Sequence, residues 1–249
     1  MSFERNFSVH FSDVDKNNIL KPSALLNYLQ EIGSLHTDSV KLGLYQVPIL
    51  HFAWIVLGWK IKINSLPKWN DQLRVVTWPR SFNNFFYFRD YEIYNNKDEK
   101  IACATSKWIC FDTENQRIEK VSEKVTSLLP TDGTTIFDEK FGKMKEPLSY
   151  ENTFFYTILK HDIDTNNHLN NVKYLTLALE VLPDSVSSTD ISEIEIMYKN
   201  SSYLHEDIVC LYHKETEKEH IVTIKSKDQT ILHGILKFTL KDRKQYETS

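Results

Sequence analysis

The chain has little of the residues that mark special classes of protein. Its 249 residues include six glycines, seven prolines and three cysteines. Few glycines and no Pro-rich or Ser-rich tract argue against disorder. The cysteines are odd in number, lack a Cys-x-x-Cys spacing and lie in strand-like segments. We therefore expect Cys103, Cys110 and Cys210 to be buried, reduced thiols that act neither as nucleophiles nor as metal ligands.

Long apolar runs and basic clusters are also missing. No window approaches the roughly 20 apolar residues that a membrane-spanning helix needs, and the N-terminus has no cationic start followed by an apolar run. We expect no membrane association and a cytoplasmic location. The net charge is −4 and no block of Lys and Arg occurs, so nucleic acid is not an expected partner.

One long motif is present twice. Asp162-Ile-Asp164-Thr-Asn166-Asn167-His168-Leu-Asn170-Asn171 resembles Asp13-Val-Asp15-Lys-Asn17-Asn18-Ile19-Leu20 at a constant offset of 149 residues (162 − 13). Such a long period indicates a duplicated domain and not a solenoid. His168 replaces the aliphatic Ile19 of the first copy. We therefore expect the C-terminal half to carry the chemistry.

In each half of the chain, the residue pattern predicts one strand, one long helix and four further strands. The first half has an amphipathic helix over residues 23–42, which Gly43 is placed to end, and strands over 7–11, 52–63, 72–78, 84–94 and 100–111. The second half has a helix over about 171–182 and strands over 153–159, 191–198, 207–213, 220–226 and 231–240. Between them, charge runs with Pro130 and Pro147 predict a connector with a short helix over 122–129.

This order of elements is that of the hotdog fold, in which a mostly antiparallel sheet wraps a long helix; the step rests on analogy between folds. We predict an α+β chain with two hotdog domains in tandem, a double hotdog. The expected limits are 1–118 for the N-terminal domain, 119–150 for the linker and 151–249 for the C-terminal domain with the active motif.

The repeated motif does not fit a metal site. An EF-hand calcium loop needs Gly at its sixth position and Glu at its twelfth, where the second copy has Asn167 and Lys173. Zinc needs four ligands, and His161 and His168 have no partnering Cys or His-Glu-x-x-His pattern. We expect no metal and no other cofactor.

The motif is better suited to catalysis of acyl transfer. It lies just before a helix, whose free backbone N–H groups can stabilise a developing oxyanion. The Asn166 amide can donate to a carbonyl oxygen, His168 can move a proton near neutral pH, and Asp164 can hold the imidazole or take a proton from water. Asp and Asn are also favoured in turns and helix caps, so a purely structural loop is the alternative interpretation.

The sequence resembles the fatty acyl-acyl carrier protein (acyl-ACP) thioesterases of plant plastids and bacteria. The resemblance covers nearly the whole chain. Its most specific part is the motif from Asp162 to Tyr174, and further parts are Pro67-Lys-Trp69, Thr77-Trp-Pro79, Arg89-Asp90 and Ala104-Thr-Ser-Lys-Trp108.

The resemblance implies a double hotdog that hydrolyses fatty acyl-ACP, releases free fatty acid and terminates fatty acid synthesis. It places the family's catalytic Asp, Asn and His on Asp164, Asn166 and His168, and it implies acyl carrier protein as the partner. The sequence leaves the oligomeric state open between a monomer and a homodimer. The family's usual Glu aligns with Ser201, followed by Ser202, so the expected carboxylate is absent here. Water activation then falls on Asp164 with His168, or on a carboxylate elsewhere.

Three other functions stay open at the level of the sequence. An acyl-CoA thioesterase would perform the same chemistry on another carrier. A hotdog dehydratase would use a His with an acidic residue on a β-hydroxyacyl substrate. The missing Glu also allows a non-catalytic acyl-binding protein.

Overall fold

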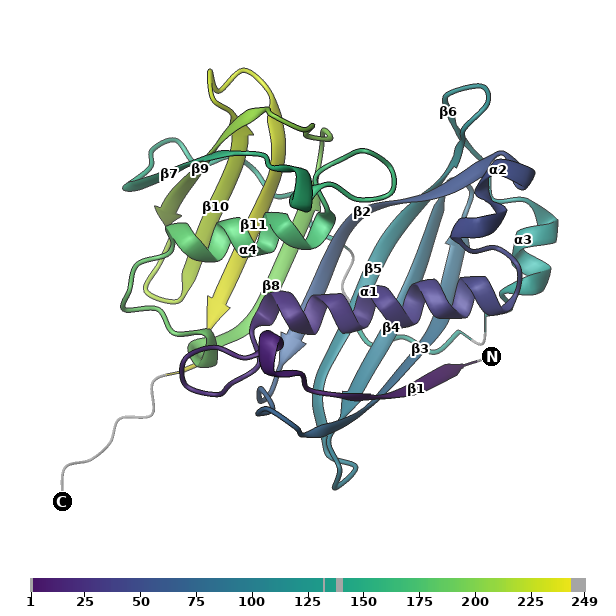
Figure 1. Cartoon of the computed structure of the whole chain (residues 1–249), viewed down its shortest axis with the longest axis horizontal. Coiled ribbons are helices and arrows are strands. Elements are labelled where there is room, and N and C mark those ends of the chain that lie inside the picture. Colours follow the sequence, from purple (N-terminus) through teal and green to yellow (C-terminus); the bar gives the residue numbers. More distant parts are fainter. Residues whose placement is uncertain (1, 132, 138–140, 243–249) are drawn as a thin grey trace. The chain divides into compact units, whose positions relative to one another are not determined.

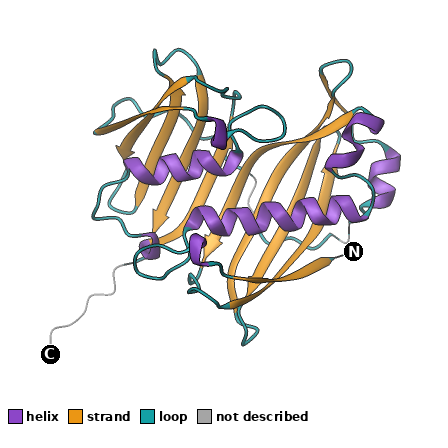
Figure 2. Cartoon of the chain, in the orientation of Figure 1, coloured by secondary structure: helices purple, strands orange, loops and turns teal. Residues whose placement is uncertain are grey.

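The computed structural model describes residues 2–131, 133–137 and 141–242 (Figure 1). Met1, Asp132, residues 138–140 and residues 243–249, which fall inside the expected domain limits, lie outside this part. The chain forms two compact units, Met1–Lys143 and Met144–Ser249. Each unit packs one long helix against an antiparallel sheet (Figure 2). The predicted α+β double hotdog is therefore confirmed.

The first unit contains a five-stranded antiparallel sheet in the order β1-β3-β4-β5-β2, with a short sixth strand, β6, paired to β5. The strands are β1 (Phe3–Ser8), β2 (Phe52–Ile63), β3 (Gln72–Asn83), β4 (Phe86–Tyr94), β5 (Lys100–Asp112) and β6 (Arg117–Glu119). The helices are α1 (Pro22–Ser39), α2 (Val47–Leu50) and α3 (Glu123–Leu128), with short 3₁₀ turns η1 (Phe11–Asp13) and η2 (Leu44–Gln46). Helix α1 crosses the face of this sheet (Figure 1).

Helix α1 forms because an apolar stripe with helical spacing follows a proline that suits the first turn. Pro22 stands at the start, and Leu25, Leu29 and Ile32 are completely buried. A side chain at Gly33 would lie 3.1 Å from the Tyr91 hydroxyl, so glycine permits the close approach of the helix to β4. Burial of this stripe against the sheet removes apolar surface from water and so stabilises the unit.

The helix ends three residues earlier than its sequence predicts. Its last residue is Ser39, and Lys41 takes the left-handed conformation that we expected at Gly43. Gly43 is required for a different reason, because a Cβ there would lie 2.7 Å from Asp38 Cα. The glycine thus permits a close backbone contact and is not the helix cap.

His36, on α1, is a buried partner of Arg89. Its Nδ1 lies 2.8 Å from Arg89 Nη1, and its ring stacks on Phe3 with the ring centroids 5.1 Å apart. Burial, followed by the nearby Arg89 charge, lowers the pKa of His36 to about 3. The ring is therefore neutral near pH 7, and Nδ1 can accept from the guanidinium.

The second unit repeats the plan. Its antiparallel sheet has the order β7-β9-β10-β11-β8. The strands are β7 (Asn152–Thr157), β8 (Ile191–Tyr198), β9 (Asp207–Lys214), β10 (Glu219–Ser226) and β11 (Leu232–Leu240), and the helix is α4 (Asn171–Val181), with 3₁₀ turns η3 (Lys160–Asp162) and η4 (Ser188–Asp190). Helix α4 buries Leu175 and Ala178 completely against β9 and β10.

Two strands differ from their sequence-based limits by more than two residues at one or both ends. The first strand was expected over 7–11 but covers Phe3–Ser8 and pairs with β3. Strand β3 was expected to end before Pro79, yet it continues to Asn83. A β-bulge between Pro79 and Ser81 explains this, because a bulge tolerates a residue that has no N–H to donate to the sheet.

The segment expected to connect the domains contributes to the first unit. Ser122 caps α3 by accepting from the Val125 amide, and Val125 and Leu129 pack in a buried cluster with Leu42 and Tyr87.

In the part of the chain that the structure describes, no helix has both the length and the apolar character needed to cross a membrane.

Candidate active site

The loop that leads into α4 is shaped by the side chain of Asp164. Its Oδ1 accepts from the backbone N–H groups of Asn166, at 2.8 Å, and His168, at 3.2 Å. The Asp164 backbone N–H donates to the His168 carbonyl at 2.8 Å, and Asn167 takes the left-handed conformation, with φ of 61°. One carboxylate oxygen therefore sets the backbone of all three predicted site residues.

The first copy of the motif folds in the same way. Asp15 Oδ1 accepts from the backbone N–H groups of Asn17, at 2.8 Å, and Ile19, at 3.0 Å. Asn18 is left-handed, with φ of 65°, and the Asp15 N–H donates to the Ile19 carbonyl at 2.8 Å. The loop is thus built by Asp and Asn in both units, and it forms without a histidine.

A second aspartate, Asp162, anchors this loop to the second unit. Asp162 is 1% exposed and accepts from the Tyr156 hydroxyl, at 2.7 Å, and the Leu159 amide, at 2.9 Å. Lys173, on the first turn of α4, pairs with it at 3.0 Å. Burial opposes ionisation of Asp162, but these hydrogen bonds and the lysine outweigh it and lower its pKa. The loop is therefore tied to β7 and to α4 at once.

The start of α4 is capped internally. Asn170 Oδ1 accepts from the Val172 N–H at 2.9 Å, and the Asn170 carbonyl accepts from the Lys173 N–H at 2.8 Å. Our expectation that the first backbone N–H groups of this helix bind an oxyanion is therefore wrong for these two groups, because the cap already uses them. The side-chain amide of Asn166 remains as the predicted donor.

The three predicted side chains share the loop but are not linked to one another. Asn166 is exposed and Asp164 and His168 are half-buried. Within the described residues, no hydrogen bond joins the side chains of Asp164, Asn166 and His168. The expectation that Asp164 holds the imidazole is not met in this structure, because Asp164 Oδ1 is turned back onto the loop's own amides. The ring of His168 instead lies against Tyr203, at 5.1 Å between centroids and nearly perpendicular.

The position of the expected Glu is exposed and its neighbour is buried. Ser201 is exposed, whereas Ser202 has no exposed surface and its Oγ accepts from the Tyr174 hydroxyl at 3.2 Å. The Ser202 carbonyl accepts from the Leu169 N–H at 2.9 Å, which joins this segment to the motif loop. Ser202 is therefore a structural contact and has no access to a substrate carbonyl.

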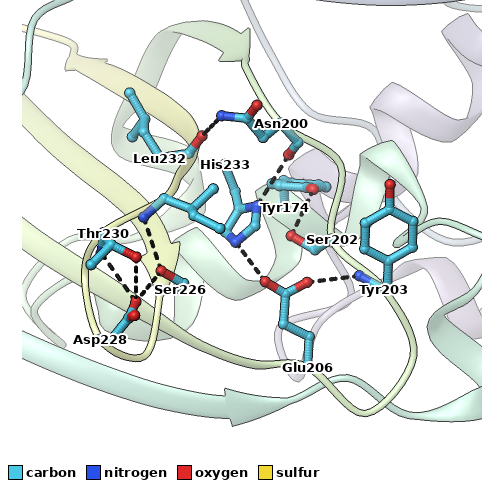
Figure 3. Close-up of polar contacts among 11 residues, drawn as sticks. Tyr174, Asn200, Ser202, Tyr203, Glu206, Ser226, Asp228, Thr230, Leu232 and His233 are labelled. Atoms are coloured by element: carbon cyan, nitrogen blue, oxygen red, sulfur yellow. Dashed lines mark hydrogen bonds and ion pairs between the residues drawn. The ribbon is translucent and has the colours of Figure 1, made fainter.

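Sequence reasoning missed a carboxylate on the neighbouring segment, Glu206, and a histidine on β11, His233. Glu206 Oε1 lies 2.9 Å from His233 Nε2, and Glu206 Oε2 accepts from the Tyr203 N–H at 2.9 Å (Figure 3). His233 is 1% exposed, and its Nδ1 lies 3.1 Å from the Asn200 carbonyl. No sequence signal marks Tyr203 or Glu206, because residues 199–206 and their structural counterpart 64–71 share no identical residue.

All three cysteines are free thiols, and Cys110 and Cys210 are buried as expected, whereas Cys103 is only half-buried, contrary to our expectation. Burial raises the pKa of the Cys110 thiol to about 11 and that of the Cys210 thiol to about 12. Burial also raises the pKa of the Cys103 thiol. The thiolate form is therefore disfavoured at all three positions, which makes them poor nucleophiles.

Comparison with solved structures identifies the fold class of this protein. The tandem hotdog architecture is shared with an acyl-ACP thioesterase from Bacteroides thetaiotaomicron, at a TM-score of 0.88 and 20% identity over 96% of this chain and 98% of that one. It is also shared with a 12:0-ACP thioesterase from Umbellularia californica, at a TM-score of 0.84 and 18% identity over 96% and 97% of the two chains. At these low sequence identities, the structural similarity establishes the fold alone.

The family follows from the sequence. Residues 1–129 match the acyl-ACP thioesterase N-terminal domain and residues 146–241 match the C-terminal domain. The chain belongs to the acyl-ACP thioesterase family. It is 29% identical to a chloroplastic oleoyl-acyl carrier protein thioesterase of Coriandrum sativum, over 90% of this chain and 65% of that protein. A chloroplastic palmitoyl-acyl carrier protein thioesterase of Cuphea hookeriana is 25% identical, over 79% and 51%. The chain thus spans about half to two thirds of the length of these curated relatives.

Proposed function

We propose that this protein hydrolyses the thioester between a fatty acyl chain and acyl carrier protein, releases free fatty acid and so terminates fatty acid synthesis. The observation that carries the proposal is the match of both halves to the acyl-ACP thioesterase domains. Relatives named for oleoyl-, palmitoyl- and dodecanoyl-acyl carrier protein support an acyl-ACP substrate.

In the proposed reaction, Asn166 and His168 touch the reacting atoms. The Asn166 amide donates to the thioester carbonyl oxygen, and His168 takes a proton from a water molecule as its oxygen attacks the carbonyl carbon. The tetrahedral intermediate carries its negative charge on the oxygen held by Asn166. As it collapses, the carbon–sulfur bond breaks, and the leaving thiolate of the phosphopantetheine arm receives the proton from His168.

We assign Asp164 the role of shaping the loop. The same carboxylate contacts occur at Asp15, in the copy that has isoleucine in place of the histidine. The charge of Asp164 is then not needed to take a proton from water, whereas the two backbone contacts of its Oδ1 are needed to present Asn166 and His168.

A pair of substitutions at Asp164 tests this role. Asp164→Asn keeps a side-chain oxygen that can accept from both amides, so we expect kcat within about tenfold of the unmodified protein, since a tenfold change corresponds to about 1.4 kcal/mol. Asp164→Ala leaves the amides of Asn166 and His168 without their acceptor and is expected to cost about 1–3 kcal/mol of unfolding free energy. We expect a larger loss of kcat for this variant. Thermal unfolding and steady-state kinetics measure the two effects.

Asp15 provides the matched control in the first unit. Asp15→Ala is expected to lower stability by a similar amount and to leave kcat nearly unchanged. If Asp164→Asn folds normally but is as inactive as Asp164→Ala, the carboxylate itself takes part in proton transfer and the loop-shaping role is wrong.

The experiment that tests the function is thiol release from acyl carrier protein substrates of graded chain length, beside acyl-CoA of the same chains. We expect kcat/KM to be at least about tenfold higher for the carrier protein, as roughly 1.4 kcal/mol of additional binding to the carrier would give. Purified His168→Ala protein, run in parallel, shows whether the release belongs to this protein.

Each rival function has its own result in this assay. Faster release from acyl-CoA would identify an acyl-CoA thioesterase. An enoyl product from a β-hydroxyacyl substrate would identify a dehydratase. Tight retention of fatty acid without any thiol release would identify an acyl-binding protein.

A further inference from the structure

The segment 199–206 of the second unit has a structural copy in the first. The Tyr203 N–H donates to Glu206 Oε2 at 2.9 Å and the Glu206 N–H to the Tyr203 carbonyl at 3.1 Å. In the first unit, the Lys68 N–H donates to Asp71 Oδ2 at 2.8 Å and the Asp71 N–H to the Lys68 carbonyl at 3.1 Å. The residues before the acids, His205 and Asn70, are both left-handed, with φ of 67° and 68°.

Each copy of this turn lies against its motif loop. The Leu169 N–H donates to the Ser202 carbonyl at 2.9 Å, and the Leu20 N–H donates to the Pro67 carbonyl at 2.8 Å. Tyr203 consequently meets His168, as Lys68 meets Ile19 across a β-bridge. In the second unit, an aromatic ring, Tyr203, thus faces the proposed general base. In the first unit, the matching position is a lysine that faces Ile19.

The second unit adds a contact between the half-buried Glu206 and the buried His233 behind the turn. Glu206 extends past the turn to reach His233 Nε2, while the His233 carbonyl accepts from the Lys199 N–H at 2.8 Å (Figure 3). In the first unit, the Ile101 carbonyl accepts from the Asn64 N–H at 2.9 Å, so Ile101 stands at the place of His233. Ile101 is 4% exposed and His233 is 1% exposed.

The first unit therefore forms the same turn with an aspartate and an isoleucine. Burying a glutamate and a histidine costs desolvation that an apolar side chain avoids. The His233 ring lies between two oxygen atoms, the Asn200 carbonyl at 3.1 Å from Nδ1 and the Glu206 carboxylate at 2.9 Å from Nε2. The contact with His233 gives Glu206 a second anchor, so that the turn is held from β11 as well as from its own backbone.

We propose that Tyr203 positions the imidazole of His168, and that the Glu206–His233 pair holds Tyr203 in place. The inference rests on the proposed function. It assigns a role to a carboxylate on the segment where the family's Glu is missing, but as a support and not as a base, because both Glu206 oxygens are already engaged. The Tyr203 ring restricts rotation of the imidazole and shields part of it from water, which keeps the general base aligned with its water molecule.

The decisive variant gives the second unit the two residues that the first unit has at these positions. Glu206→Asp with His233→Ile reproduces the arrangement of Asp71 and Ile101. Each single substitution is expected to lower stability, because it leaves one member of the pair without its partner. The double variant is expected to regain stability but to keep kcat reduced by about 10- to 100-fold, with KM within about twofold, since misplacement of a catalytic group lowers turnover on this scale. Recovery of both stability and kcat would show that the pair is only structural and would overturn the proposal.

Substitutions of Tyr203 test the same idea without risk to the fold, since this side chain is 55% exposed. Tyr203→Phe keeps the ring and is expected to retain most of kcat, whereas Tyr203→Leu is expected to lower kcat about tenfold at nearly unchanged KM, a change of about 1.4 kcal/mol in the barrier. Lys68→Ala, at the matching place of the first unit, is the control and is expected to change neither constant. Equal kcat for the Leu and Phe variants would overturn the role of Tyr203.

A spectroscopic readout separates this inference from the function. Because the two rings are in contact, we expect the Tyr203 ring to shift the NMR signals of the His168 ring protons. We expect that shift to persist in Tyr203→Phe and to disappear in the double variant. This result does not depend on any substrate, so a protein that releases no thiol would refute the proposed function and still allow this contact to be tested. Persistence of the shift in the double variant would show that Glu206 and His233 do not hold Tyr203.

Discussion

Replacing His168 with alanine is expected to lower kcat for acyl-ACP by about 10²- to 10⁴-fold, the usual contribution of a positioned general base. The imidazole is the proposed acceptor of the proton of the attacking water, and its main contact in the described structure is the ring of Tyr203. Its removal therefore leaves the polar contacts of the loop intact. Thiol release under single-turnover conditions measures the chemical step directly.

The fold is expected to survive this change. Ile19 occupies the same position in a loop with the same backbone hydrogen bonds, so His168→Ile is the matched variant and should be as inactive as His168→Ala. We expect the alanine variant to lose about 1 kcal/mol of unfolding free energy at most, the usual contribution of one aromatic pair. Turnover close to that of the unmodified protein in either variant would remove His168 from the mechanism.

Replacing Asn166 with alanine is expected to lower kcat by about 10²- to 10³-fold, the range observed when a single oxyanion donor is removed. The Asn166 side chain is exposed, and its backbone N–H remains bound to Asp164 after the substitution. No internal contact of the described chain is lost, so reduced activity can be attributed to the lost interaction with substrate. The measurements are kcat and KM with one acyl-ACP substrate, beside thermal unfolding.

Asn17→Ala, at the matching position of the first unit, is the control for Asn166. It removes an equivalent amide from the same kind of loop and is expected to leave kcat unchanged. Asn166→Asp is a sharper test, because it keeps the size of the side chain but replaces the donor with a negative charge. If Asn166→Ala raises KM without lowering kcat, the amide binds substrate but does not stabilise the transition state.

Local patterns were sufficient for most elements of the fold. Strands β2 and β8 begin and end where the β-branched and aromatic runs predict, because strand propensity and pattern coincide there. Pro79 misled the prediction, since its tolerance inside β3 depends on a bulge against the neighbouring strand β4. Gly43 misled it as well, because the need for glycine comes from the approach of Asp38 and not from the local backbone angle.

In the candidate site, too, local sequence patterns predicted some features, while others depend on tertiary contacts. The repeated motif located Asp164, Asn166 and His168 on one loop without any structure, and the two copies indeed share their hydrogen bonds. The role of Asp164 was less predictable. A carboxylate near an imidazole suggests a pair, but the direction of the side chain depends on which backbone amides it meets, and these become apparent only when the loop is folded.

The sequence by itself therefore determined the duplicated α+β architecture, the family and the loop that carries the predicted chemistry, because these depend on periodicity and on residues close together in the chain. Only the tertiary structure placed Tyr203 against His168 and His233 beside Glu206. These contacts join residues that are 35 and 27 positions apart (203 − 168 and 233 − 206). No local pattern encodes such contacts, since they arise only when the strands pair and bring distant segments together.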